Sequence, residues 1–218
     1  MSVKIPRRLS IAGPLGGVLL VLLVAACSGG GSSKKASPTA TQPSATATAT
    51  GTPTQVPTPT ATPTPYDGDV DRFMIPSLGV DAPVENLGVD ASNTMETPTR
   101  ENTDVGWYHI WDRPGWDGNA VFSAHVYWEN VPAPFQKLDS LTNGAEIDIE
   151  MNNGQVYKYQ VISKNRYNRD TIPMGDIIWP KNRPAGEQWI TMITCGGQLD
   201  STGWEYLSRD VVVAKRIA

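Results

Sequence analysis

The C-terminal part of the sequence alternates short apolar runs with turn-forming residues, which is typical of β-strands. Residues 146–151 read Glu-Ile-Asp-Ile-Glu-Met, the period of a strand with one solvent-facing side. Asn153-Gly154 then favours a hairpin turn, because both residues tolerate positive φ. Residues 155–163 are the expected partner strand. We expect further strands at 72–75, 83–87, 119–124, 188–194 and 210–217.

This pattern predicts an all-β domain. Long helical periodicity is absent, and only residues 134–141 favour a helical turn or two. About eight short strands at this spacing predict an antiparallel barrel that is closed or half-closed. Residues 165–188 contain three prolines and are expected to form a long loop before the strand at 188–194.

The first 27 residues have the layout of a secretory signal. Lys4, Arg7 and Arg8 precede a charge-free apolar stretch, which ends in small residues before Cys27. A cysteine at this point resembles a bacterial lipobox, in which Cys27 is lipidated and becomes the new N-terminus. At about 18 residues, the stretch also leaves an uncleaved membrane helix as the alternative. Both alternatives predict an extracytoplasmic, membrane-anchored protein at the cell surface.

Composition divides the rest of the chain into a linker, residues 28–66, and one domain, residues 67–218. The linker is rich in Thr, Pro, Ser and Ala and contains no apolar run, so we expect it to be disordered. The domain holds all seven tryptophans. It carries 13 basic and 22 acidic residues, a net charge of 13 − 22 = −9, which argues against a nucleic-acid surface.

Cys195 is the candidate nucleophile. Exported proteins normally pair their cysteines, yet a lipidated Cys27 would leave Cys195 alone. A lone cysteine is more often a small buried apolar residue. Cys195, however, follows the apolar run 190–194 and precedes two glycines, which permit close backbone approach or simply a turn. An active thiol additionally needs a proton-transfer group and an oxyanion donor.

Few residues can supply those two groups. The sequence has two histidines, of which His125 follows the apolar run 120–124 and is therefore expected at a strand end. His109 lies in a loop-like region, so we favour His125. Two arginines follow the cysteine, Arg209 at the start of the last apolar strand and Arg216 near its end. Spacing alone leaves Arg209 equally compatible with a plain surface position.

The order His125, Cys195, Arg209, with Thr191-Met192-Ile193-Thr194 before the cysteine, resembles the sortase family. Further similar segments, close to class E and class F sortases, are residues 73–84, 114–121 and 206–214. The resemblance implies an eight-stranded β-barrel and a cysteine transpeptidase that cleaves an LPXTG-like sorting signal of surface proteins. The acceptor would be an amine of a cell-wall precursor or of a pilin, or water, and no cofactor is implied. No metal-ligand spacing is present.

The resemblance also assigns roles. Cys195 would attack the threonine carbonyl of the signal, His125 would protonate the leaving amine, and Arg209 would hold the substrate backbone and the oxyanion. Gly196 would permit close approach of the substrate, and Trp204 would form an apolar wall. Additional candidates for substrate binding are Thr194, Ile177 and Ile178, although strand or core packing explains most of them equally well.

The sequence departs from the usual sortase pattern in two ways, and three other classes of protein have to be compared with it. Sortases usually have Gly before the histidine and often Asp two residues after it, whereas this chain has Ala124 and Tyr127. Familiar sortases are also held by a transmembrane helix, whereas this sequence predicts a lipid anchor at Cys27. L,D-transpeptidases need a histidine close before the cysteine, which is absent here, and NlpC/P60-type peptidases place the cysteine before the histidine. A lipoprotein binding module with a merely packed Cys195 is the non-enzymatic alternative.

Overall fold

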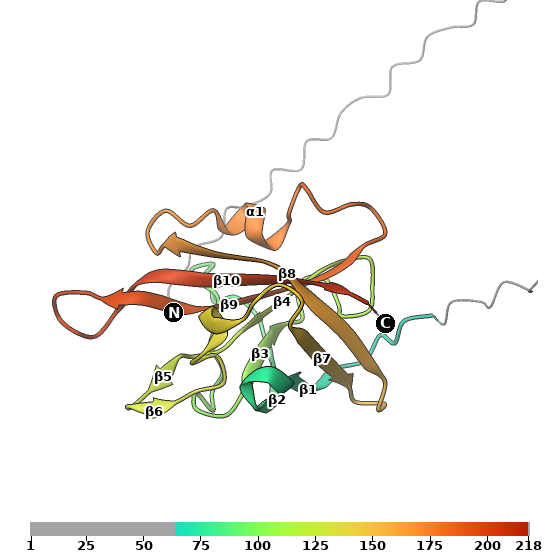
Figure 1. The fold of residues 1–218 in the computed structure, drawn as a ribbon, viewed down its shortest axis with the longest axis horizontal. Helices are drawn as coiled ribbons and strands as arrows, with labels where there is room; N and C mark the ends of the chain where they lie inside the picture. The colour runs from blue at the N-terminus through green and yellow to red at the C-terminus, as the bar shows by residue number, and fades with distance from the viewer. Residues whose placement is uncertain (1–63, 218) are drawn as a thin grey trace, which may run out of the picture. The chain divides into compact units, whose positions relative to one another are not determined.

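A computed structural model describes residues 64–217, which fold into a β-barrel (Figure 1). The predictions for the signal sequence, for Cys27 and for linker residues 28–63 lie outside the described residues. Among residues 64–217, no helix is long and apolar enough to cross a membrane. The barrel strands are β1 Val70–Ile75, β2 Val80–Leu87, β3 Val105–Tyr108, β4 Gly118–Ser123, β7 Glu146–Met151, β8 Val156–Asn168, β9 Gln188–Leu199 and β10 Tyr206–Arg216.

The barrel closes in the order β1-β2-β3-β4-β9-β10-β8-β7, which confirms the eight-stranded fold predicted from the sequence. The expectation of a purely antiparallel barrel is wrong. β2 pairs in parallel with β3, and β4 pairs in parallel with β9. Parallel neighbours need long crossover connections, and the segments 88–104 and 124–187 provide them.

The smaller elements lie in the connections between these strands. A two-stranded hairpin, β5 Tyr127–Trp128 and β6 Val131–Pro132, follows β4. Short helical segments are η1 Pro76–Leu78, η2 Leu138–Ser140 and α1 Met174–Ile178. The helical turn expected at 134–141 is therefore η2.

Side-chain burial explains the pattern of apolar and polar residues in each strand. β7 alternates, with Ile147 and Ile149 buried and their polar neighbours half-exposed or exposed. β9 is instead buried from Trp189 to Thr194, because both of its faces are covered. On one face Met192 joins the core inside the barrel, and on the other Ile193 packs in a second cluster with residues of α1.

Several strand boundaries differ from the sequence predictions. β1, β2 and β10 begin at Val70, Val80 and Tyr206 rather than at residues 72, 83 and 210. β3 was not predicted, because four residues containing a glycine carry too little periodicity to identify a strand. β8 extends to Asn168 rather than 163, so the loop before β9 is shorter than predicted. β9 continues past Cys195 to Leu199, because its pairing with β10 resumes after a register shift, with Tyr206 opposite Leu199 and Ser208 opposite Gly196.

Candidate functional site

Cys195 and Arg209 are direct partners across the antiparallel β9–β10 pair. Residues opposite each other in such a pair project from the same face of the sheet, with their Cβ atoms about 4.5–5.5 Å apart. The register therefore brings a thiol and a guanidinium together although they are 14 residues apart in the sequence.

His125 reaches the same place through the parallel pairing of β4 with β9, in which Ser123 lies opposite Ile193. Just beyond this pair, the Thr194 hydroxyl donates a hydrogen bond of 2.7 Å to the Ala124 carbonyl. The backbone N–H of Phe135 donates to the His125 carbonyl at 3.1 Å. The residues that carry the imidazole and the thiol are thus joined through their immediate neighbours.

One cavity of about 900 Å³ is lined by Cys195, His125 and Arg209 together. Cys195 is a free thiol and is half-buried. Burial raises the pKa of the Cys195 thiol, and the positive charge of Arg209 opposes this effect. Other residues that line the cavity are Tyr127, Trp128, Glu129, Arg169, Asp170, Ile172, Trp204 and Tyr206.

The imidazole of His125 has no polar partner among residues 64–217. Its Nε2 atom is buried without a hydrogen bond. Burial also lowers the pKa of His125. Tyr127, which stands where sortases often have Asp, donates no hydrogen bond to the imidazole. Its hydroxyl instead accepts one from the Gln136 side chain at 2.5 Å.

Arg209 is anchored to the backbone and oriented by it. The side chain is buried, with 4% of the residue surface exposed. Its Nη1 atom donates to the carbonyls of Tyr206 and Ser208 at 3.0 and 2.9 Å. Its Nε–H is buried and has no protein acceptor in the described part of the chain. Arg209 also lines the cavity that contains Cys195, so its guanidinium can donate to an oxyanion formed there.

The family model described as Sortase domain matches residues 73–217. The chain belongs to the sortase family. Sortases are cysteine transpeptidases, so this assignment gives the chain that chemistry at the level of the family. No curated protein sequence matches the chain.

Solved sortase structures share the fold of this sortase. Sortase C2 of the Group B Streptococcus pilus island 1 has a TM-score of 0.51 at 19% identity, covering 67% of this chain and 73% of that one. Sortase C1 from Streptococcus agalactiae has a TM-score of 0.52 at 18% identity, covering 70% and 69%. A lid mutant of sortase A from Corynebacterium diphtheriae has a TM-score of 0.50 at 21% identity, covering 67% and 69%.

Gly196 of this sortase lies against the buried carboxylate of Asp210. Asp210 is held by Arg166 through two hydrogen bonds of 2.6 and 2.7 Å. A Cβ atom at position 196 would lie 2.1 Å from the Asp210 Oδ2 atom. Gly197 has φ of 75°, a conformation that favours glycine, at the register shift between β9 and β10. The two glycines let β10 approach closely behind Cys195 and set the bulge next to Arg209.

Of the remaining residues considered from the sequence, some line the cavity and others lie away from it. Trp204 lines the cavity with 86% of its surface exposed. Ile177 and Ile178 lie in α1 and pack in the second core cluster, and Ile172 of the same connection lines the cavity instead. His109 is exposed after β3, and Arg216 stacks on the Tyr157 ring at 4.6 Å. Neither His109 nor Arg216 lines the cavity.

Several cavity residues were not found from the sequence. Tyr127 and Trp128 lie two and three residues after the histidine, and two adjacent aromatic residues there were a usable signal. Arg169, Asp170 and Tyr206 carried no such signal, because their place at the site depends on how β8 and β10 pair with other strands.

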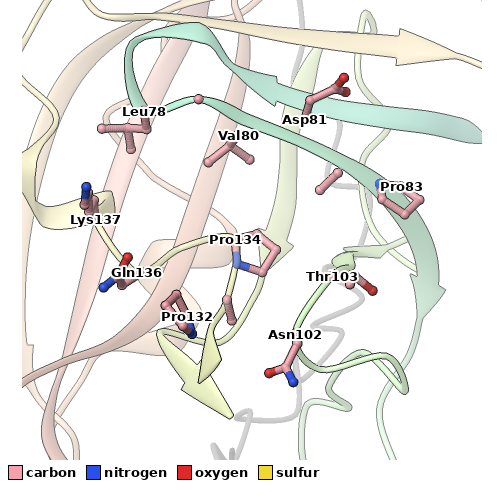
Figure 2. Close-up of a pocket in the computed structure, with 13 residues that line it drawn as sticks. Leu78, Val80, Asp81, Pro83, Asn102, Thr103, Pro132, Pro134, Gln136 and Lys137 are labelled. Atoms are coloured by element: carbon pink, nitrogen blue, oxygen red, sulfur yellow. The ribbon is translucent and has the colours of Figure 1, made fainter. Parts of the chain in front are cut away.

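Two further hollows are present, and one of them adjoins this cavity. Cys195 also lines a smaller one of about 370 Å³ with Gly196, Arg166 and Asp210. The other, of about 520 Å³, lies between the start of β2, residues 102–103 and the segment 132–137, and Figure 2 shows side chains from all three. It contains neither Cys195 nor His125. Among residues 64–217, no group of three or more His, Cys, Asp or Glu side chains is arranged to hold a metal ion.

Replacing Thr194 by valine should lower both stability and activity. The change leaves the buried Ala124 carbonyl without its donor, which typically costs about 1–3 kcal/mol in the free energy of unfolding. Urea denaturation measures this loss. Thr191→Val is the matched control, because Thr191 is equally buried on β9 and donates to Asn119 Oδ1 at 2.8 Å. Equal turnover of the two variants would contradict a positioning role for Thr194.

Proposed function

We propose that this sortase cleaves an LPXTG-like sorting signal and transfers the released protein to an amine nucleophile. One observation carries the proposal, the convergence of Cys195, His125 and Arg209 on a single cavity, with Cys195 and Arg209 as cross-strand partners. The cavity beside the thiol also argues against the alternative of a non-enzymatic binding module, in which Cys195 would be sealed in the core.

The proposed chemistry proceeds through a thioester. The Cys195 sulfur attacks the threonine carbonyl carbon, and the C–N bond to the following glycine breaks after a tetrahedral intermediate forms. His125 takes the thiol proton and gives it to the departing amine. The Arg209 guanidinium donates to the oxyanion of the intermediate. An amine then attacks the thioester and releases the thiol, whereas attack by water would make the same site a peptidase.

The cavity walls suggest how the signal is held. Ile172 and Trp204 provide apolar surface for the leucine and proline of the motif. We propose that Ile177 and Ile178 support this wall, because Ile172 packs against the buried cluster that contains both of them. The roles proposed for Gly196 and Thr194 are to shape the backbone around Cys195.

The proposed partners follow from the same chemistry. They are surface proteins that carry the sorting signal, together with an amine from a cell-wall precursor or a pilin lysine. We propose attachment to the membrane through lipid on Cys27, followed by the linker, and extracytoplasmic action at the cell surface. A class E-like or class F-like assignment is part of the same proposal. Radiolabelled palmitate incorporation that is lost in Cys27→Ala tests the anchor.

Formation of a mixed disulfide on Cys195 should depend on pH as expected for a thiol that is neutral in the resting enzyme. The raised pKa of Cys195 and the lowered pKa of His125 both favour the neutral pair near pH 7. The reaction rate of Cys195 with a small methanethiosulfonate reagent should therefore rise about tenfold per pH unit. The rise should continue beyond pH 8.5, where the reaction rate of a free thiol levels off. Arg209→Ala should raise the thiol pKa further. A rate that is already level below pH 8 would indicate a resting ion pair instead.

Product analysis tests the proposed function directly. The protein is incubated with LPXTG-type and LAXTG-type peptides, with and without added triglycine, and the products are separated by chromatography. Cleavage after the threonine with transfer to the amine is the expected result. Cleavage without transfer would assign a peptidase, and no cleavage of either peptide would reject the proposed substrate class.

A further inference from the structure

The His125 imidazole needs a source of orientation other than hydrogen bonding. Among residues 64–217 no group hydrogen-bonds to its ring nitrogens, and Nε2 is buried. The rotation of a histidine ring about χ2 is broad, and a hydrogen bond to one ring nitrogen normally fixes it. A histidine that gives a proton to a departing amine must nevertheless point one nitrogen at it.

The indole of Trp128 supplies the packing contact. The ring centroids of His125 and Trp128 lie 5.1 Å apart at an interplanar angle of 50°. This separation is in the range at which aromatic rings attract each other. Both residues line the cavity that contains Cys195. The indole therefore packs against the imidazole within the lining of this cavity.

The β5–β6 hairpin holds Trp128 in this position. Trp128 is paired with Val131 across the hairpin. Glu129 and Asn130, between them, have φ of 48° and 64°, as a tight two-residue turn with left-handed backbone requires. At the base, the Ala133 N–H donates to the Val126 carbonyl at 3.0 Å. The hairpin thus begins next to His125 and fixes the backbone of Trp128, three residues after the histidine, so that its ring lies against the imidazole.

We propose that Trp128 is a positioning residue, which holds the His125 imidazole by ring packing where no carboxylate does so. This rests on the proposed role of His125 as the proton donor. Trp128→Ala should lower kcat about 10- to 100-fold, because the imidazole can rotate away from the leaving amine. KM should change less than about twofold, since ground-state substrate binding does not require the oriented nitrogen. Trp128→Phe should restore most of kcat.

The decisive experiment combines these kinetics with NMR of the full chain labelled at histidine. Only His109 and His125 give ring signals, and His109→Gln assigns them. An indole over the imidazole shifts the His125 C–H resonances through its ring current, so Trp128→Ala should move them and leave those of His109 in place. Trp116→Ala is the matched control, since Trp116 is 38% exposed against 41% for Trp128 and does not line the cavity. It should change neither kcat nor the signals.

The NMR measurement needs no substrate, so its result is independent of the proposed function. His125 resonances that stay in place in Trp128→Ala would overturn the positioning role whatever the activity of the enzyme. The same conclusion would follow if Trp128→Phe were as slow as Trp128→Ala, or if the loss appeared in KM alone. Shifted resonances with an inactive wild-type protein would instead overturn only the transpeptidase proposal.

Discussion

Cys195→Ala is expected to abolish turnover of a sorting peptide, with a loss of at least about 10⁴-fold. Alanine removes the atom that forms the thioester, and no second thiol lies in the described residues to replace it. Fluorescence of a quenched sorting peptide measures the rate. The fold should be unaffected, because Cys195 is only half-buried and alanine is smaller.

Cys195→Ser is the matched control for this prediction. It keeps the size and the hydrogen-bonding capacity of the side chain but replaces a thiol with a much weaker nucleophile near neutral pH. It should therefore be nearly as inactive as alanine and should still bind the peptide. Substantial turnover by either variant would place the nucleophile elsewhere and contradict the proposed chemistry.

Arg209→Ala is expected to give the second largest loss, about a hundredfold to a thousandfold in kcat. Removal of one oxyanion donor typically costs about 2.7–4 kcal/mol in the free energy of the transition state. Arg209 lines the cavity, and the two backbone hydrogen bonds of its Nη1 atom fix the direction of the guanidinium. Steady-state kinetics of the purified variant measure the change.

Arg216→Ala provides the comparison for Arg209. Both arginines belong to β10, but Arg216 stacks on Tyr157 and donates to Gln188, outside the cavity. Its loss should lower the free energy of unfolding while kcat stays within about twofold of the wild type. If Arg209→Ala were as active as Arg216→Ala, the oxyanion role would have to be abandoned.

The sequence was sufficient for the parts of the fold that depend on local patterns. The alternation at 146–151 and the Asn153-Gly154 turn predicted β7 and the following hairpin, because solvent on one face imposes period 2. The parallel pairs β2–β3 and β4–β9 could not be predicted in this way. They join segments that are distant in the chain, and no local residue pattern encodes which strand becomes the neighbour.

The candidate site likewise contains residues that the sequence predicted and contacts that it did not predict. Cys195, His125 and Arg209 were predicted from their order and from the residues before the cysteine, which resemble the sortase family. In the structure, all three side chains line one cavity. The packing of Asp210 against Gly196 and of Trp128 against His125 was not predicted. The first contact forms only when β9 pairs with β10, and the second forms only when the β5–β6 hairpin folds.

The central proposal is that Cys195, with His125 and Arg209 beside it, forms a thioester with the sorting signal. The most direct measurement is the intact mass of the full chain, quenched in acid after brief incubation with an LPXTG-type peptide and followed by peptide mapping. We predict a mass increase equal to the peptide up to its threonine, located on Cys195 and removed by hydroxylamine. Turnover of the peptide by a protein whose Cys195 never carries that mass, even when the acceptor amine is withheld, would contradict the account.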